Sequence, residues 1–159
     1  MTDPQPRFVY VDANPFIYLI ESDDSLAASV RDLFAMFQAR PGLAVTSELT
    51  LAEVLPKAAM LFRRAYFDLI VWSGAFDLRP IRRQILVETA DYRRKSATTM
   101  VDGRKTMPKI PDAIHVVTAA RSGCRWIISA DGAMKVPSGF RLIDPNDAAA
   151  VSDLLREIA

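Results

Sequence analysis

Short runs of apolar, β-branched residues alternate with longer stretches that carry apolar side chains at helical spacing, and this alternation constrains the fold most. The expected strands cover residues 8–11, 43–46, 75–78, 125–129 and 140–143. The expected helices include residues 26–38, 82–96, 111–123 and 146–158. Strands that alternate with helices are joined by right-handed crossovers, which build a mostly parallel sheet with helices on both faces. The sequence therefore predicts an α/β fold.

Local signals set the expected ends of the remaining elements. Asn14 is a suitable N-cap for a helix that follows the first strand. Pro56 is expected to break the helix that begins near Ser47, and a second helical piece then continues to about Trp72. The polar stretch 98–109 is predicted to be a loop.

The chain has 159 residues, half of them apolar and a quarter charged, which is typical of one globular domain. We expect residues 1–7 to be an N-terminal tail that lacks a secretion signal, and residues 8–159 to be a single domain. Charged residues interrupt the most apolar stretch, 54–72, so it is not expected to span a membrane. The lone cysteine, Cys124, excludes an internal disulfide and a cysteine-based zinc site. We therefore expect a cytoplasmic protein.

The formal net charge of +1 hides an uneven distribution along the chain. Residues 1–56 carry 3 basic and 8 acidic side chains, whereas residues 57–109 carry 12 basic and 5 acidic ones. A basic central third indicates a polyanionic partner, and Tyr66 and Tyr92 lie nearby in the sequence as candidates for stacking on bases. The alternative is that these charges are solvated helix faces.

Four acidic residues stand where the predicted sheet would bring them together: Asp12, Glu53, Asp112 and Asp131. Asp12 and Asp131 each follow an expected strand, and parallel strands place their carboxyl ends at one edge of the sheet. Two carboxylates about 4 Å apart repel by roughly 4 kcal/mol at an effective dielectric constant of about 20. Such a cluster requires protonation or a hard divalent cation, and oxygen ligands suit Mg²⁺ or Mn²⁺.

Each of these acids also has a purely structural interpretation. Asp12 can simply end a strand, and Asp131-Gly132 is a common turn pair. The segment Thr50-Leu51-Ala52-Glu53 matches a capping box, and Asp112 follows Pro111 in a first helical turn, where the helix dipole favours any acid. Only the joint placement of the four carboxylates distinguishes a metal site from four separate structural roles.

The segments that contain these acids resemble the PIN-domain ribonucleases, especially the VapC-type toxins of toxin–antitoxin pairs. The matching segments are FVYVDANPFIY (8–18), TSELTLAEVL (46–55), IPDAIHVVTAA (110–120) and WIISAD (126–131). The resemblance implies a three-layer α/β/α sandwich and a metal-dependent endoribonuclease that cleaves RNA phosphodiester bonds with Mg²⁺ or Mn²⁺. It implies that the catalytic, metal-binding residues are Asp12, Glu53, Asp112 and Asp131, supported by Asn14 and Ser129.

The resemblance also implies partners: an RNA substrate, a VapB-type antitoxin and a second copy of the chain in a homodimer. The surplus of apolar residues in 58–72 beyond what one helix face needs fits a partner groove or a dimer interface. One position departs from the family pattern, because Ala130 stands where Asn is common. This departure keeps open a second interpretation, a catalytically degenerate PIN-like module that binds RNA or protein without cleaving it.

His115 is the only histidine and lies three residues after Asp112, on nearly the same helix face. Two roles are open to it: a general base or metal ligand, or a packed and hydrogen-bonded helix residue. We interpret it as the latter, since the family often carries His here without a core catalytic role.

Overall fold

The computed structural model describes residues 8–22 and 27–159 and is built around a five-stranded sheet in the order β3-β2-β1-β6-β7. The strands are β1 (Phe8–Val11), β2 (Ala44–Ser47), β3 (Phe76–Arg79), β6 (Cys124–Ile128) and β7 (Arg141–Ile143). Every neighbouring pair in this sheet is parallel. Each strand boundary lies within one residue of its predicted position. The predicted tail 1–7 and the predicted helix start at Leu26 lie outside the described residues.

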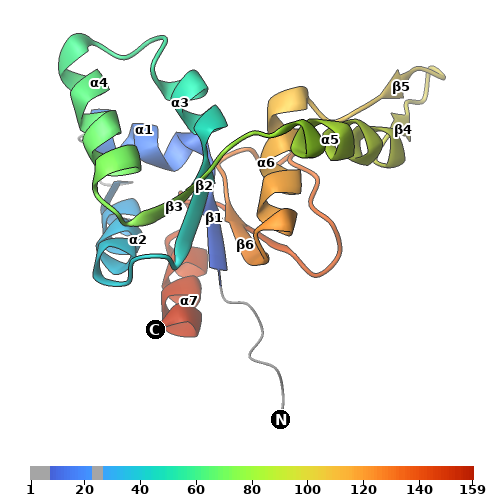
Figure 1. Cartoon of the computed structure of the whole chain (residues 1–159). Coiled ribbons are helices and arrows are strands. Elements are labelled where there is room, and N and C mark those ends of the chain that lie inside the picture. Colours follow the sequence, from blue (N-terminus) through green and yellow to red (C-terminus); the bar gives the residue numbers. More distant parts are fainter. Residues whose placement is uncertain (1–7, 23–26) are drawn as a thin grey trace.

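Helices cover both faces of the sheet (Figure 1). The helices α1 (Ala13–Glu21), α2 (Ala27–Ala39), α4 (Met60–Phe67) and α7 (Ala148–Ile158) lie on one side, and α5 (Arg83–Lys95) and α6 (Ile110–Arg121) lie on the other. The short helix α3 (Glu48–Val54) follows β2 directly. The structure confirms the predicted α/β/α sandwich with a parallel central sheet.

Alternate side chains of β1 enter the two cores. Val9 and Val11 join the larger core under α1, α2 and α7, whereas Tyr10 joins the smaller core with Val116 of α6. This period of two follows from the pleat of a strand that is buried on both faces. Asp12, two residues after Tyr10, is therefore directed toward the α6 side.

Four phenylalanines hold the larger core together: Phe16, Phe34, Phe37 and Phe76. The ring centroid of Phe16 lies 5.2 Å from that of Phe34, edge to face, and 5.0 Å from that of Phe76. Aromatic pairs at this separation add to the stabilisation that burial alone provides. The aromatic cluster thus fixes the position of α1 and of the connection between β1 and α1.

One prediction about a helix start is wrong, and the alternative interpretation of Thr50 as the N-cap of a capping box is excluded. The N-cap of α1 is Asp12 rather than Asn14, because the Asp12 carboxylate accepts a hydrogen bond from the Ala13 N–H at 2.7 Å. Thr50 is not the N-cap of a capping box, since it lies inside α3, whose N-cap is Ser47. The Thr50 Oγ1 instead lies 3.0 Å from Thr46 Oγ1, so the buried hydroxyl is satisfied by a neighbouring strand residue.

The predicted loop 98–109 is wrong in part, because it contains an antiparallel hairpin of β4 (Thr98–Thr99) and β5 (Lys105–Thr106). The Asp102 carboxylate accepts a hydrogen bond from the Arg104 N–H at 3.1 Å, and Gly103 adopts a φ of 82°. Threonine favours strands and Asp-Gly favours a tight reversal, so the signal for this hairpin was present in the sequence.

The expected second helical piece also differs, since α4 ends at Phe67 and a π-helical turn, η1 (Asp68–Trp72), continues from it. Met60, Leu61 and Trp72 are 82%, 79% and 73% exposed. Part of the apolar surplus in this segment therefore faces solvent. No helix within the described residues combines the length and the apolar composition needed to cross a bilayer.

Replacing Phe16 with alanine tests the aromatic cluster. We expect Phe16→Ala to lower the free energy of unfolding by about 3–5 kcal/mol, because it leaves a cavity at a fully buried position. Leu61→Ala, at an exposed position on α4, should change it by less than about 0.5 kcal/mol. Urea denaturation followed by circular dichroism measures both, and equal losses would show that the cluster is not the centre of the core.

Candidate functional site

The carboxyl ends of β1, β2 and β6 meet at one edge of the sheet, and the predicted acids lie around it. Asp12 directly follows β1 and is almost fully buried. Glu53 lies on α3, Asp112 in the first turn of α6, and Asp131 three residues after the end of β6. The chain therefore brings acids from four separate segments to a single region.

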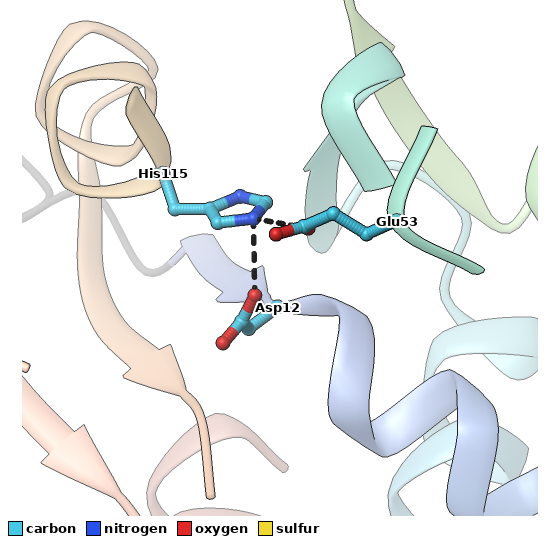
Figure 2. A group of neighbouring side chains, drawn as sticks. All are labelled: Asp12, Glu53 and His115. Carbon is cyan, nitrogen blue, oxygen red and sulfur yellow. Dashed lines mark hydrogen bonds and ion pairs between the residues drawn. The ribbon is translucent and has the colours of Figure 1, made fainter. Parts of the chain in front are cut away.

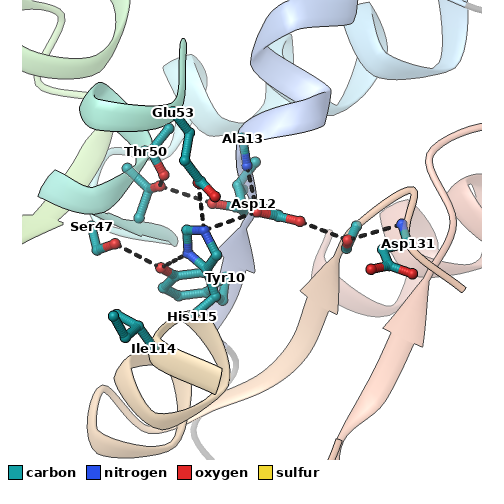
Figure 3. Close-up of polar contacts among 12 residues, drawn as sticks. Tyr10, Asp12, Ala13, Ser47, Thr50, Glu53, Ile114, His115 and Asp131 are labelled. Carbon is teal, nitrogen blue, oxygen red and sulfur yellow. Dashed lines mark hydrogen bonds and ion pairs between the residues drawn. The ribbon is translucent and has the colours of Figure 1, made fainter. Parts of the chain in front are cut away.

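Hydrogen bonds hold Asp12 in one orientation (Figure 3). One carboxylate oxygen accepts from the Ala13 N–H at 2.7 Å, and the other accepts from the Ser129 hydroxyl at 2.6 Å. The same hydroxyl oxygen accepts a hydrogen bond from the Asp131 N–H at 3.1 Å. Ser129 thus connects the Asp12 side chain to the loop that carries Asp131.

His115 lies between Asp12 and Glu53 (Figure 2). Its Nε2 is 2.7 Å from Glu53 Oε2 and 3.1 Å from Asp12 Oδ1. Candidate ligand atoms of these three residues all lie within 4.8 Å of one another. His115 is thus buried and hydrogen-bonded, as expected, but its partners are the acids themselves, so the choice between a packed residue and a metal ligand stays a prediction.

A buried chain of hydroxyl groups continues behind His115. The Tyr10 hydroxyl lies 2.7 Å from His115 Nδ1 and donates to Ser47 Oγ at 3.0 Å. Because the Tyr10 hydroxyl donates to Ser47, its oxygen can accept a hydrogen bond from Nδ1–H, while Nε2 faces the carboxylates of Glu53 and Asp12. Burial raises the pKa of the Tyr10 hydroxyl well above its usual value, with nearby Asp12 adding to the effect. Tyr10 therefore remains a neutral hydrogen-bonding group.

The charge of the imidazole depends on the acids in front of it. Burial alone would lower the pKa of His115, but the Glu53 hydrogen bond and the charge of Asp12 outweigh burial and raise it. The imidazole accordingly offsets part of the negative charge of Asp12 and Glu53.

Asp112 and Asp131 form a second pair of acids beside the first. They line one cleft of about 230 Å³ together with the ammonium-bearing residues Lys109 and Lys135. Burial raises the pKa of the Asp112 carboxyl, and the negative charges of Asp131 and Asp12 raise it further. This pair thus faces charge repulsion that a cation would relieve.

The donor set fits a hard divalent cation. The carboxylates of Asp12 and Glu53 lie in one group of candidate ligands with His115, whereas Asp112 and Asp131 lie beside that group and are not part of it. Carboxylate oxygens are the ligands that Mg²⁺ and Mn²⁺ prefer. The charges of Asp131 and Asp12 add to the effect of burial on the pKa of Asp112, so these three carboxylates are close enough to oppose one another.

Among the predicted site residues, Asn14 has the fewest polar side-chain contacts within the described part of the chain. It lies half-buried in the first turn of α1, one position beyond the Asp12-capped Ala13. Tyr10 and Ser47, in contrast, were not predicted as site residues and form the support of His115. The alternation of β1 places Tyr10 on the α6 side, and that signal was available in the sequence.

A third of the basic residues in 57–109, four of twelve, are paired with carboxylates on the surface. Arg64, Arg79, Arg94 and Arg104 form exposed ion pairs with carboxylates of the same segment. Exposed pairs of this kind contribute little to stability. For these four arginines the solvated-surface interpretation agrees with their contacts.

Thermal melting with and without a divalent cation tests the acid cluster. The pKa of Asp112 is raised in the folded chain, so the folded state loses stability as the pH rises and this carboxyl ionises. We therefore expect Asp112→Asn to have a higher melting temperature than the parent at pH 7 without metal. MgCl₂ or MnCl₂ at about 100 times its Kd should stabilise the parent by about 2.7 kcal/mol, or roughly 5–10 °C.

Asp112→Asn should lose most of this response to the cation. Asp153→Asn, at an exposed position on α7, should melt and respond like the parent. An equal cation response in all three proteins would contradict a site at the acids.

Comparisons with known proteins agree with this fold. The PIN domain family model matches residues 9–139. The solved structure of VapC20 from Mycobacterium tuberculosis, a sarcin–ricin loop cleaving toxin, is similar with a TM-score of 0.59 and 16% sequence identity. The match covers 78% of this chain and 90% of that one, and at this identity it shows a shared fold. A comparison with curated proteins gives no significant match.

The matched region contains all three segments that supply the buried cluster of Asp12, Glu53 and His115, as well as Asp112 and Asp131. It also spans the strands β1, β2, β3 and β6, whose order sets the edge where the acids lie. The family model covers most of the chain, and the chain belongs to the PIN domain family.

Proposed function

We propose that this chain is a Mg²⁺- or Mn²⁺-dependent endoribonuclease of the VapC type, with residues 8–159 as a single nuclease domain. The observation that carries the proposal is that Asp12 and Glu53 form one group of candidate ligands with His115 at the edge of a PIN-domain sheet. Asp112 lies beside this group, close enough to Asp12 and Asp131 for their charges to raise its pKa. The similarity in fold to VapC20, described as a toxin that cleaves the sarcin–ricin loop, supports a toxin as its biological role.

Different residues of the site orient different carboxylates. A divalent cation held by the carboxylates would activate water and offset the charge that develops on the scissile phosphate. Ala13 N–H and the Ser129 hydroxyl fix both oxygens of Asp12, so that this carboxylate needs no reorientation. His115 fixes Glu53 in the same way, and Tyr10 holds the imidazole ring. Asp112 and Asp131 present their charges to the adjoining cleft.

A toxin of this type requires partners, which we propose to be a VapB-type antitoxin and a second copy of the chain, with all of them in the cytoplasm. The exposed apolar side chains of Met60, Leu61 and Trp72 supply surface for such contacts. Apolar patches of this kind on a folded chain commonly mark protein interfaces.

The proposed function is tested by RNA cleavage with Asp12→Asn. Loss of the buried carboxylate should reduce cleavage at least about 100-fold, since even residues that only support metal ligands cost about 10–100-fold when removed. Asp153→Asn provides the matched control, because it makes the same chemical change far from the site. The assay is sequencing of the 5′ ends that appear in total cellular RNA after addition of protein and MnCl₂.

Undiminished cleavage by Asp12→Asn would refute the proposed active site. RNA binding without any cleavage by the parent protein, across a titration of Mg²⁺ and Mn²⁺, would instead identify the catalytically degenerate PIN-like module that Ala130 leaves open.

Tyr10→Phe tests the support behind His115. Removal of the hydroxyl leaves His115 Nδ1 and Ser47 Oγ without a shared partner, so the ring that orients Glu53 is less firmly held. We expect kcat to fall about 10–100-fold with little change in KM, as for other groups that orient metal ligands. Tyr66→Phe is the control, since it removes a hydroxyl that donates to Glu21 at 2.8 Å, away from the site.

A purely structural role of Tyr10 predicts a lower melting temperature and an unchanged kcat for the folded fraction. That outcome would contradict the positioning role, whereas a lowered kcat at full folding would support it.

A further inference from the structure

A cleft leads away from the acids beneath the β4–β5 hairpin. Asp112 and Asp131 line it together with Thr98 and Thr106 from the paired hairpin strands. Lys109, just before α6, and Lys135, in the loop after β6, also line it. We refer to this space of about 230 Å³ as the hairpin cleft.

Contacts with α5 anchor both walls of the hairpin cleft. Arg93 Nε donates to the Pro108 carbonyl at 2.7 Å on one wall, and the Tyr92 hydroxyl donates to the Lys135 carbonyl on the other. The Thr98 and Thr106 hydroxyls, 3.0 Å apart, join the two hairpin strands at their base. The hairpin itself extends outward beside the end of α5 (Figure 1). The walls are therefore held by the fold rather than by a ligand.

Lys135 and Lys109 place positive charge along the hairpin cleft, and the charge of Lys135 has no carboxylate partner among the described residues. Lys135 Nζ lies 3.2 Å from the Ser96 carbonyl oxygen and 3.5 Å from Thr98 Oγ1, both of which are uncharged. Within residues 8–22 and 27–159, no carboxylate forms an ion pair with this ammonium group. The charge of Lys109 is close enough to Asp112 to oppose the rise of that carboxyl's pKa. The cleft thus combines carboxylates at one end with cationic groups beside them.

This arrangement of charges suits a nucleic-acid strand whose phosphodiester backbone runs past the acids. Carboxylates alone would repel a phosphate, and a polyanion needs cations on either side of the point where it meets them. Lysine ammonium groups bind phosphates as point charges. Met107 and Met134 add adaptable apolar surface to the same lining, against which a ribose or base can pack.

We propose that the hairpin cleft holds single-stranded RNA next to the scissile phosphate, with Lys109 and Lys135 contacting its backbone. This inference rests on the proposed nuclease function and adds the route of the substrate across the site. An acidic peptide is the less favoured occupant, because the cleft opens onto Asp112 and Asp131, where cleavage would take place.

The test measures RNA binding without cleavage. A fluorescein-labelled single-stranded RNA is titrated with the full chain carrying Asp12→Asn, and anisotropy gives Kd over a range of salt concentrations. Adding Lys109→Gln and Lys135→Gln should raise the Kd for RNA on the order of tenfold. The slope of log K against log salt should become shallower by about 0.7 for each phosphate that the protein no longer neutralises.

Matched variants separate charge from folding. Lys109→Arg with Lys135→Arg keeps both charges and should retain the parent affinity. Arg31→Gln removes one positive charge from an exposed position on α2, on the other side of the sheet, and should leave Kd unchanged. Melting temperatures measured by circular dichroism establish that each variant is folded.

The outcomes distinguish this inference from the proposed function. In one outcome the unmodified chain cleaves RNA, but the two glutamine substitutions leave the RNA affinity of the Asp12→Asn chain unchanged. The hairpin cleft is then not the RNA site, and the proposed function stands. In another outcome the unmodified chain cleaves no RNA, but the two glutamine substitutions still weaken RNA binding by the Asp12→Asn chain. The cleft then remains an RNA site, and the nuclease proposal fails. Reduced affinity for a polyglutamate peptide with unchanged RNA affinity would overturn the inference in favour of an acidic protein partner.

Discussion

Repulsion among carboxylates that the fold forces together is the constraint on which the site depends. The sheet order places Asp12 beside Asp131, and α3 and α6 bring Glu53 and Asp112 to the same edge. His115 offsets part of this charge between Asp12 and Glu53, whereas the pKa of Asp112 stays raised. The folded chain without a cation therefore retains electrostatic strain on the Asp112 side. Packing of the two cores has to exceed this cost, which is the usual relation between a strained site and its scaffold.

The pleat of β1 connects that site to the cores. Val9 and Val11 pack under the α1–α2 layer while Tyr10 reaches His115 on α6. A shift of one residue in the pairing of β1 would reverse all of these directions at once. The neighbouring strands on both sides and the aromatic packing around Phe16 prevent such a shift.

The sequence was sufficient to predict what depends on periodicity and on the order of segments. The five strands, the helices on both faces and the convergence of acids all follow from patterns of that kind. It was insufficient where two local signals competed, as at Asn14 and Asp12, because both residues cap helices and only the close approach of α1 to β1 selects Asp12. The contacts of His115 with Tyr10 and Glu53 join residues 105 and 62 positions apart, and such pairings are determined by tertiary packing.

The distance in sequence between the partners of Asp12 has a consequence for the time at which the site forms. Ser129, which fixes one oxygen of Asp12, is 117 positions away, and β1 lies in the sheet between β2 and β6. Contacts of such separation form late, because the loop that joins them must first be closed. A nascent chain that ends before Ile110 contains Asp12 and Glu53 but neither Ser129 nor the α6–β6 unit that orders them. The acidic centre is thus assembled only after the α6–β6 unit and Ser129 have been synthesised, long after Asp12 itself.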